Sequence, residues 1–186
     1  VETFPILVTT DHTHLLGTNT AATILSALGA TQAVLRLVNV VGGVISNLTL
    51  RDGLQPATGV RVGAGLSAFH SDALVVDSDI RNNVGAAASG SHGGGVYMDG
   101  GSLSLLRCKI RNNRTAASSD GAGLFRNYGR LSLDGCEVVN NRNDSGTYAA
   151  GGALYAASAG SSRLHNCLVA NNRDQFAAIQ HGAGQL

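Results

Sequence analysis

A pair of asparagines recurs along the chain at the end of the same short pattern. Four segments share it: VDSDIRNN (76–83), LRCKIRNN (106–113), DGCEVVNN (134–141) and HNCLVANN (165–172). Their third residue is Ser or Cys and their fifth is Ile or Val. An earlier segment, SNLTLRDG (46–53), fits the same frame, and successive third positions are 30, 30, 28 and 31 residues apart. A fixed period of this length indicates a repeat protein.

Two further elements share this period. A glycine-rich element precedes each copy and reads GAGL (63–66), GGGVY (93–97), GAGLF (121–125) and GGALY (151–155), and HGAG (181–184) begins another copy. Between the two elements, apolar residues alternate, as in Leu103 and Leu105 or Leu131 and Leu133. Alternation over a few residues bounded by Gly, Ser and Asp is typical of a short strand. Each unit is therefore predicted to hold three short strands.

One such unit cannot bury its apolar side alone, but stacked units can. If each unit is one coil, equivalent residues lie about 4.8 Å apart on neighbouring coils and form rows along the axis. Small or medium residues are expected in one interior row, formed by Leu48, Ser78, Cys108, Cys136 and Cys167. Buried asparagines need hydrogen-bond partners and can bond to each other between coils. We therefore predict an asparagine ladder of Asn82, Asn112, Asn140 and Asn171, with Asp52 at its N-terminal end.

The combined pattern resembles right-handed parallel β-helix proteins, and especially the repeats of chlamydial polymorphic outer membrane proteins and related bacterial or algal surface proteins. The resemblance covers about residues 43–184, and residues 6–25 fit it more loosely. It implies an all-β, right-handed parallel β-helix of about six coils in one domain, 1–186. Residues 1–42 would form irregular N-terminal coils and residues 43–186 regular coils. The resemblance also implies an extracellular or cell-surface location and a structural or adhesive role.

The composition limits the partners. The formal charge is +1 and only 13% of residues are charged, so no strong attraction to nucleic acid or anionic membranes is expected. No apolar run reaches the roughly 20 residues of a membrane-spanning helix. The chain starts at Val1 and stops inside a new repeat. We therefore expect either a fragment of a longer protein or stacking on other copies or flanking domains through open solenoid ends.

Outward-facing charges supply the candidate ligand site. Arginines form one like-charged row, and a lysine and an aspartate are predicted on the same face; the five candidates are Arg51, Arg81, Arg111, Lys109 and Asp79. Three more arginines, Arg114, Arg142 and Arg173, follow the asparagine pair. A cationic stripe would bind an acidic polysaccharide or cell-surface glycan, whereas a solvated face is the plainer interpretation. Cross-coil ion pairs are expected along two rows, Asp79–Lys109–Glu137 and Asp77–Arg107.

A polysaccharide lyase is the sharpest enzymatic alternative for a β-helix. Such an enzyme uses a base and a neutralising cation, often with Ca²⁺. Here the carboxylates are few and alternate with cations, and His12 and His14 have no third metal-ligating partner at a suitable spacing. We therefore expect no catalytic residue, no metal and no cofactor. An ice-binding surface would need a flat threonine-like outer row, which the charged outer rows do not supply.

Cysteines and glycosylation motifs complete the candidates. The three cysteines follow the coil period and are odd in number, so buried free thiols are expected rather than a disulfide framework. A bond between stacked Cys108 and Cys136 would be strained, because the coil spacing exceeds the usual Cβ separation. Asn47, Asn113 and Asn143 each begin an N-x-S/T motif. On a eukaryotic secretory route, Asn143 in a polar loop is the acceptor we favour.

Overall fold

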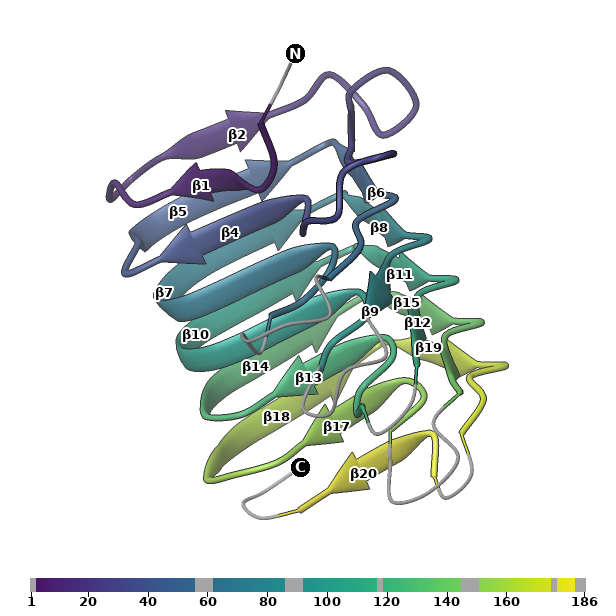
Figure 1. Ribbon diagram of the computed structural model, residues 1–186. Helices are drawn as coiled ribbons and strands as arrows, with labels where there is room; N and C mark the ends of the chain where they lie inside the picture. Colours follow the sequence, from purple (N-terminus) through teal and green to yellow (C-terminus); the bar gives the residue numbers. More distant parts are fainter. Residues whose placement is uncertain are drawn as a thin grey trace.

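The computed structural model describes residues 3–55, 62–85, 92–116, 119–144, 151–174 and 177–182, and these form a parallel β-helix of about five turns. Figure 1 shows the coils stacked one upon the next, from β1 (Ile6–Val8) in one end coil to β20 (Ile179–His181) in the other. Strand pairs along the stack are parallel. The predicted all-β solenoid is confirmed, and the number of turns agrees with the expected six or so coils. Within the described residues, no helix is long and apolar enough to cross a membrane.

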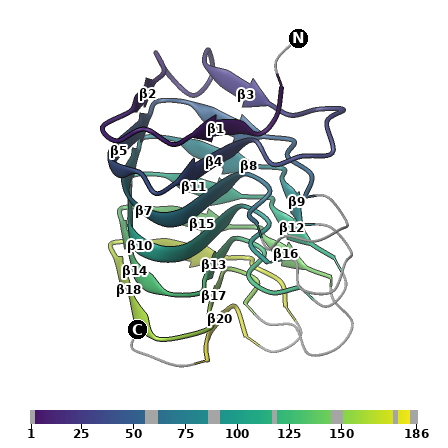
Figure 2. The ribbon, with the colours of Figure 1, turned by 60° about the vertical axis from the view of Figure 1, so that its left-hand side comes forward.

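Three parallel sheets run along the stack. The eleven-stranded sheet contains β1, β2 (His14–Leu16), β4 (Leu35–Val38), β5 (Val41–Ser46), β7 (Leu66–Val76), β10 (Val96–Leu106), β13 (Leu124–Arg126), β14 (Gly129–Asp134), β17 (Leu154–Ala156), β18 (Gly160–His165) and β20. The six-stranded sheet contains β3 (Ile24–Ser26), β6 (Thr49–Arg51), β8 (Asp79–Arg81), β11 (Lys109–Arg111), β15 (Glu137–Val139) and β19 (Leu168–Ala170). The three-stranded sheet contains β9 (Val84–Gly85), β12 (Arg114–Thr115) and β16 (Arg142–Asn143), which Figure 2 shows one below another.

The eleven-stranded sheet bends to form two faces of each coil. In most coils the bend separates two strands, such as β13 and β14. In two coils it does not, and β7 and β10 each run through it as one strand of 11 residues. His70 and Gly100 lie within these long strands and have φ of 44° and 79°. The backbone therefore turns at one left-handed residue in β7 and at two, Gly100 and Gly101, in β10, while strand pairing continues on both sides.

Rows of apolar side chains fill the interior. One row joins Leu35, Leu66, Val96, Leu124 and Leu154, all at most 1% exposed. A second joins Ile45, Val75, Leu105 and Leu133, and a third joins Leu50, Ile80, Ile110 and Val138. Full burial of one such side chain contributes about 1.5–3 kcal/mol. The stack is therefore held mainly by contacts between equivalent residues of neighbouring coils. The N-terminal region expected to be irregular follows the same order, since β1, β2 and β3 pair with β4, β5 and β6.

The first asparagine of each pair forms a corner of the coil. Asn82, Asn112, Asn140 and Asn171 have φ between 54° and 57° and are exposed, and Asp52 has φ 59° at the equivalent place. Asn and Asp tolerate this left-handed conformation better than other residues with a side chain, because the short polar group bonds locally. The chain therefore leaves the six-stranded sheet and enters the three-stranded sheet at this residue.

The second asparagine forms the ladder, so the predicted ladder residues Asn82, Asn112, Asn140 and Asn171 are wrong by one position. Nδ2 donates to Oδ1 of the next rung at 3.0 Å from Asn83 to Asn113, 3.1 Å from Asn113 to Asn141 and 2.9 Å from Asn141 to Asn172. At the N-terminal end, Oδ1 of Asn83 accepts from the backbone N–H of Gly53. Strand alternation alone would place Asn112 inward, because Ile110 is inward. The left-handed residue interrupts the alternation, and the inward position passes to Asn113.

Candidate functional site

The outer face of the six-stranded sheet carries the predicted ligand residues. The strand register aligns Arg51, Arg81 and Arg111 along the stack, and aligns Asp79, Lys109 and Glu137 two residues earlier. Because side chains alternate along a strand, both rows face away from the interior row of Leu50, Ile80 and Ile110. The structure therefore brings Asp79, Arg81, Lys109 and Arg111 onto one surface, as the sequence predicted.

Asp79 is at the centre of this surface. Arg111 in the next coil donates from Nε to Oδ1 at 3.0 Å and from Nη2 to Oδ2 at 2.7 Å. The Nε of Arg81 lies 3.2 Å from Oδ2 of the same carboxylate. The bidentate hydrogen bond to Asp79 raises the pKa of Arg111. Asp79 is only 6% exposed, although its row faces outward. This carboxylate is therefore covered, hydrogen-bonded by Arg111 and ion-paired with Arg81.

The other candidates pair in a similar way. Lys109 lies opposite Asp79 but contacts Glu137, with 3.7 Å from Nζ to Oε1. Arg51 lies 3.1 Å from Asp52 in its own coil. One expected pair, Lys109–Glu137, is confirmed, whereas Asp79 pairs with arginines rather than with Lys109. The like-charged row of arginines is therefore balanced by carboxylates.

Asp77 and Arg107 form the second expected pair, which is confirmed. Arg107 donates from Nε and Nη2 to the two carboxylate oxygens at 2.7 and 2.8 Å. These hydrogen bonds hold the pKa of Asp77 below its ordinary value. Both residues have left-handed φ, 47° and 52°, and so lie at equivalent corners of neighbouring coils. The pair bridges two corners on the outside of the stack.

A small recess lies beside these pairs. It has a volume of about 170 Å³ and is lined by Thr20, Asp77, Ser78, Asp79, Arg107 and Lys109. Pockets that enclose small-molecule ligands usually measure about 300–1,000 Å³. Within the described ranges, no group of three or more His, Cys, Asp or Glu side chains is placed to hold a metal ion. The recess could accept a single polar group, but it does not enclose a sugar unit.

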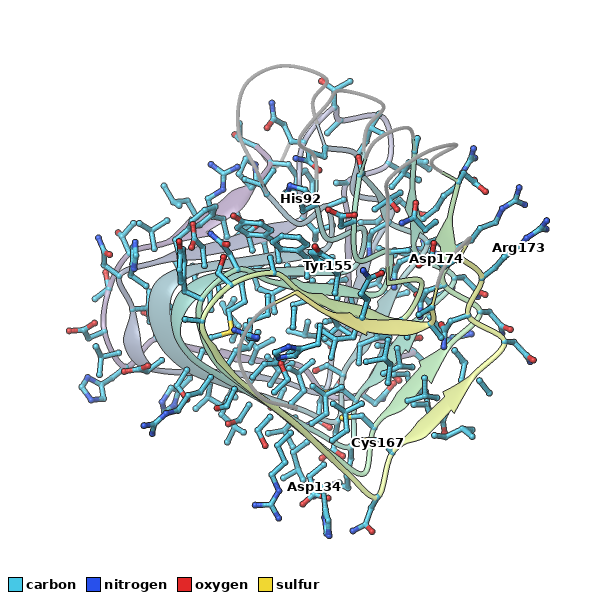
Figure 3. All side chains as sticks on the ribbon, turned by 90° about the horizontal axis from the view of Figure 1, so that it is seen from below. His92, Asp134, Tyr155, Cys167, Arg173 and Asp174 are labelled. Carbon is cyan, nitrogen blue, oxygen red and sulfur yellow. The ribbon has the colours of Figure 1, made fainter. Side chains whose placement is uncertain are left out.

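A second cationic surface lies on the three-stranded sheet. Arg114, Arg142 and Arg173 are aligned on successive coils, and we call them the arginine stripe. The side chains of Arg114 and Arg142 are 55% and 56% exposed, and both contact the carboxylate of Asp144. Figure 3 shows Arg173 at the outer edge of the stack, beside Asp174. The spacing of these arginines is visible in the sequence, but their exposure is not. Each lies two residues after the left-handed corner at the first asparagine, and this corner makes their side chains point outward.

The predicted glycosylation sites differ in exposure. Asn113 is fully buried as a ladder rung, and Asn143 is 5% exposed, with Nδ2 donating to the carbonyl of Ser119. The expectation that Asn143 lies in an accessible loop is therefore wrong, because its side chain points inward from β16. Residues 145–150 of that predicted loop lie outside the described residues. Asn47 is partly exposed, so it is the sequon asparagine that a glycan could reach in the folded chain.

The cysteines occupy the expected interior row. Cys108 and Cys136 are buried, Cys167 is partly exposed, and all three are free thiols. The backbone N–H of Cys108 donates to Sγ of Cys136 at 3.4 Å, and the Cys136 thiol donates to the Leu105 carbonyl at 3.3 Å. Hydrogen bonding with Cys108 lowers the pKa of Cys136 to about 7 and raises that of Cys108. The thiols thus act as interior groups that bond to the backbone of neighbouring coils.

The stacked coils, the interior rows and the asparagine ladder define a class of solenoid protein. The family model for a right-handed β-helix region matches residues 35–186, so the chain belongs to the right-handed β-helix family. This match covers the regular coils and confirms the predicted handedness. No curated protein and no solved structure matches the chain. The family defines the fold, and since one fold carries many activities, the function has to be argued from the surface residues.

Proposed function

We propose that the chain is a structural and adhesive module of an extracellular or cell-surface protein. The observation that carries the proposal is the bonding of Asp79, whose two oxygens accept from Arg111 of the next coil while Arg81 of its own coil contacts it. The charged residues of the six-stranded sheet thus connect coils to one another. This use of charge suits a rigid rod that presents a surface.

The same contacts argue against a lyase centred on these residues. A general base must reach the proton it removes and needs an available lone pair. Asp79 is 6% exposed and already accepts two hydrogen bonds from Arg111. The guanidinium group that would neutralise a uronate carboxylate is the same group that holds Asp79. A substrate would therefore have to break the bonding between two coils before it could react.

An incubation with polyuronates tests this proposal. The protein is mixed with pectate or alginate, with and without Ca²⁺, and the absorbance of unsaturated product is followed. We expect no increase under either condition. Product formation that disappears in Arg81→Ala or Arg111→Ala would overturn the proposal in favour of a lyase. The Lys109→Met variant serves as a control, because Lys109 lies on the same surface but forms its ion pair with Glu137.

A second candidate function, binding of an acidic polysaccharide, is favoured by the arginine stripe. Two of its guanidinium groups share the one carboxylate of Asp144, and both side chains are more than half exposed. Equivalent residues on neighbouring coils are about 4.8 Å apart, so the stripe presents a linear series of cations. Such a series suits a linear polyanion with regularly spaced carboxylates or sulfates, and Arg can bond each of them in a bidentate manner.

Salt elution from an immobilised polyuronate column tests this second function. We expect Arg114→Gln and Arg142→Gln, alone and combined, to elute at progressively lower salt than the wild type. Arg163→Gln is the matched control, since Arg163 is also exposed but lies on β18. If the control and the double variant elute together, the stripe is not the binding surface.

A further inference from the structure

An arginine lies inside the β-helix. The register of the eleven-stranded sheet aligns Leu37, Ala68, Met98, Arg126, Ala156 and His181 in one interior row. Arg126 is 0% exposed and is the largest fully buried side chain of the described residues. Its neighbour Met98 shows that a long apolar side chain fits this row. A cation at this place therefore needs an explanation other than space filling.

The guanidinium group reaches toward the C-terminal coils. Nε donates to Oγ of Ser162 at 2.9 Å, and Nη1 donates to the carbonyls of Ser158 and Ala159 at 3.1 and 3.2 Å. Nη2 is buried and has no hydrogen-bond partner, and among the described residues no carboxylate pairs with Arg126. The three acceptors are neutral, so they satisfy donors without balancing the charge.

One neighbouring position differs from the preceding coils in a way that suits this group. Ser162 follows Leu103 and Leu131 in its row, so a hydroxyl replaces an isobutyl group where Nε needs an acceptor. Ala156 follows Arg126 in its own row and is small, as Ala68 is in the same row. Gly160 is a glycine like its equivalent Gly129, and a Cβ there would lie 2.2 Å from the carbonyl oxygen of Gly129 and 2.4 Å from Nη1. The change from leucine to serine in this row thus coincides with the buried cation.

A second unpaired nitrogen lies in the same row. Nε2 of His181 is buried without a hydrogen-bond partner, two coils from Arg126 and separated from it in the row by Ala156. Figure 3 looks along the stack from the end at which these coils lie. The C-terminal interior therefore contains two buried nitrogen atoms, Nη2 of Arg126 and Nε2 of His181, that have no hydrogen-bond partner.

The buried guanidinium group of Arg126 would be stabilised by a negative charge beside it. Arginine stays protonated in proteins, and burial of an unbalanced ion costs several kcal/mol even after relaxation. Burial lowers the pKa of Arg126 from its ordinary value, which is the effect of this missing balance. Replacing a buried ion with an apolar residue is often neutral or stabilising, so retention of the arginine must bring another benefit. Binding of an anion at Nη2 would both satisfy the donor and balance the charge.

We propose that Arg126 anchors a binding site for a small monovalent anion of the halide type in the interior of the last described coils. Nη2 of Arg126 donates to the anion from one side, and the ring of His181 lies on the other side of Ala156. The anion takes the place of the carboxylate that a buried guanidinium normally pairs with. The site is independent of the charged surfaces described above, and it stabilises the C-terminal coils rather than taking part in adhesion.

Crystals of the whole chain soaked in bromide provide the direct test. We expect an anomalous peak within hydrogen-bond distance of Nη2 of Arg126, and no peak there in Arg126→Met. The methionine side chain suits the row, because Met98 occupies the preceding position. An ordered water at Nη2 without anomalous signal would overturn the proposal. A bromide peak that persists at the same place in Arg126→Met would also overturn it, because the arginine would not be the anchor.

Chloride dependence of unfolding provides a second test that needs no crystal. Chloride replaces a bulky sulfonate at constant ionic strength, so that general salt effects are equal. Above the dissociation constant, the ratio of unfolded to folded wild type should fall about tenfold for each tenfold rise in chloride. Arg126→Met should show no such dependence. If wild type and variant respond equally, or if neither responds, the anion site is not present. Should Arg126→Met fail to fold, the wild-type titration and bromide peak still decide the matter.

Discussion

The side chain of Asn113 donates a hydrogen bond to Oδ1 of Asn141 in the next coil, over 3.1 Å. It also donates to the carbonyl of Ile80 at 2.9 Å, and its own Oδ1 accepts from the backbone and side chain of Asn83. One buried amide thus connects three coils. A polar group can be buried at this depth only because each rung satisfies the next.

Replacing Asn113 with Ala should therefore cost about 3 kcal/mol of unfolding free energy. The substitution leaves the buried backbone N–H of Asn83 without its acceptor, which costs about 1–3 kcal/mol, and also removes the side-chain bonds to Ile80 and Asn141. Urea unfolding measures the change. The matched control is Asn112→Gly, which keeps the left-handed corner and should change stability by less than about 0.5 kcal/mol. Equal effects at the two positions would contradict the assignment of the ladder to the second asparagine.

Arg111→Met should destabilise the protein by about 2 kcal/mol, because it removes two charge-assisted hydrogen bonds from the buried carboxylate of Asp79. Lys109→Met on the adjacent row should cost at most about 1 kcal/mol. Its ion pair with Glu137 spans 3.7 Å between side chains that are 54% and 45% exposed. Chemical denaturation of both variants checks the difference. A larger loss for Lys109→Met would show that the central contact of this surface has been misassigned.

Acid should weaken the corner pair of Asp77 and Arg107. Since the pKa of Asp77 is below its ordinary value in the folded chain, the unfolded chain takes up this proton first as the pH falls. The pair's stabilisation is complete above about pH 4, the range where an unperturbed Asp ionises, and is lost as the pH falls further. Asp77→Asn keeps a residue that tolerates φ of 47°, as Asn47 and Asn166 do at equivalent corners. Thermal melts from pH 6 to 2 should therefore show a smaller acid loss in this variant than in the wild type, and parallel curves would refute the prediction.

Among the three asparagines that begin an N-x-S/T motif, we expect glycan attachment to depend on whether the side chain is exposed in the folded chain. In protein secreted from a eukaryotic host, we expect Asn113 and Asn143 to be unmodified in the folded fraction, because both side chains are buried. Asn47 is partly exposed and is the position where peptide mass spectrometry would find any glycan. A glycan on Asn113 in correctly folded protein would contradict the ladder, since that side chain fills the space between coils.

Much of the fold could be predicted from the sequence, because a stacked lattice repeats its chemistry at each coil. Cys108 and Ile110 alternate with Lys109 and Arg111, and this alternation identified interior and exterior rows correctly. The alternation failed at Asn112, because this left-handed residue moves the pattern of inward and outward side chains along the chain by one residue. That shift cannot be seen in a hydrophobic pattern, because both residues of the pair are asparagines.

The surface contacts were less predictable. Directly opposite residues suggested Asp79–Lys109, but the long side chain of Arg111 reaches Asp79 diagonally and bonds it with two donors. Burial of Arg126 was not predicted at all, since an arginine after GAGLF looks like an exterior residue. Only the register with Met98 and Ala156 reveals its interior position.

Fluorescence anisotropy of an end-labelled polyuronate tests the proposed function most directly, because one time course reports both binding and cleavage. The proposed function predicts that anisotropy rises when the protein is added and then stays constant for hours, with or without Ca²⁺. The rise should be reduced in the Arg114→Gln, Arg142→Gln double variant and unchanged in Arg163→Gln. A rise followed by a decay that is abolished by Arg111→Ala would contradict it, because the chain would then be cutting the polymer rather than holding it.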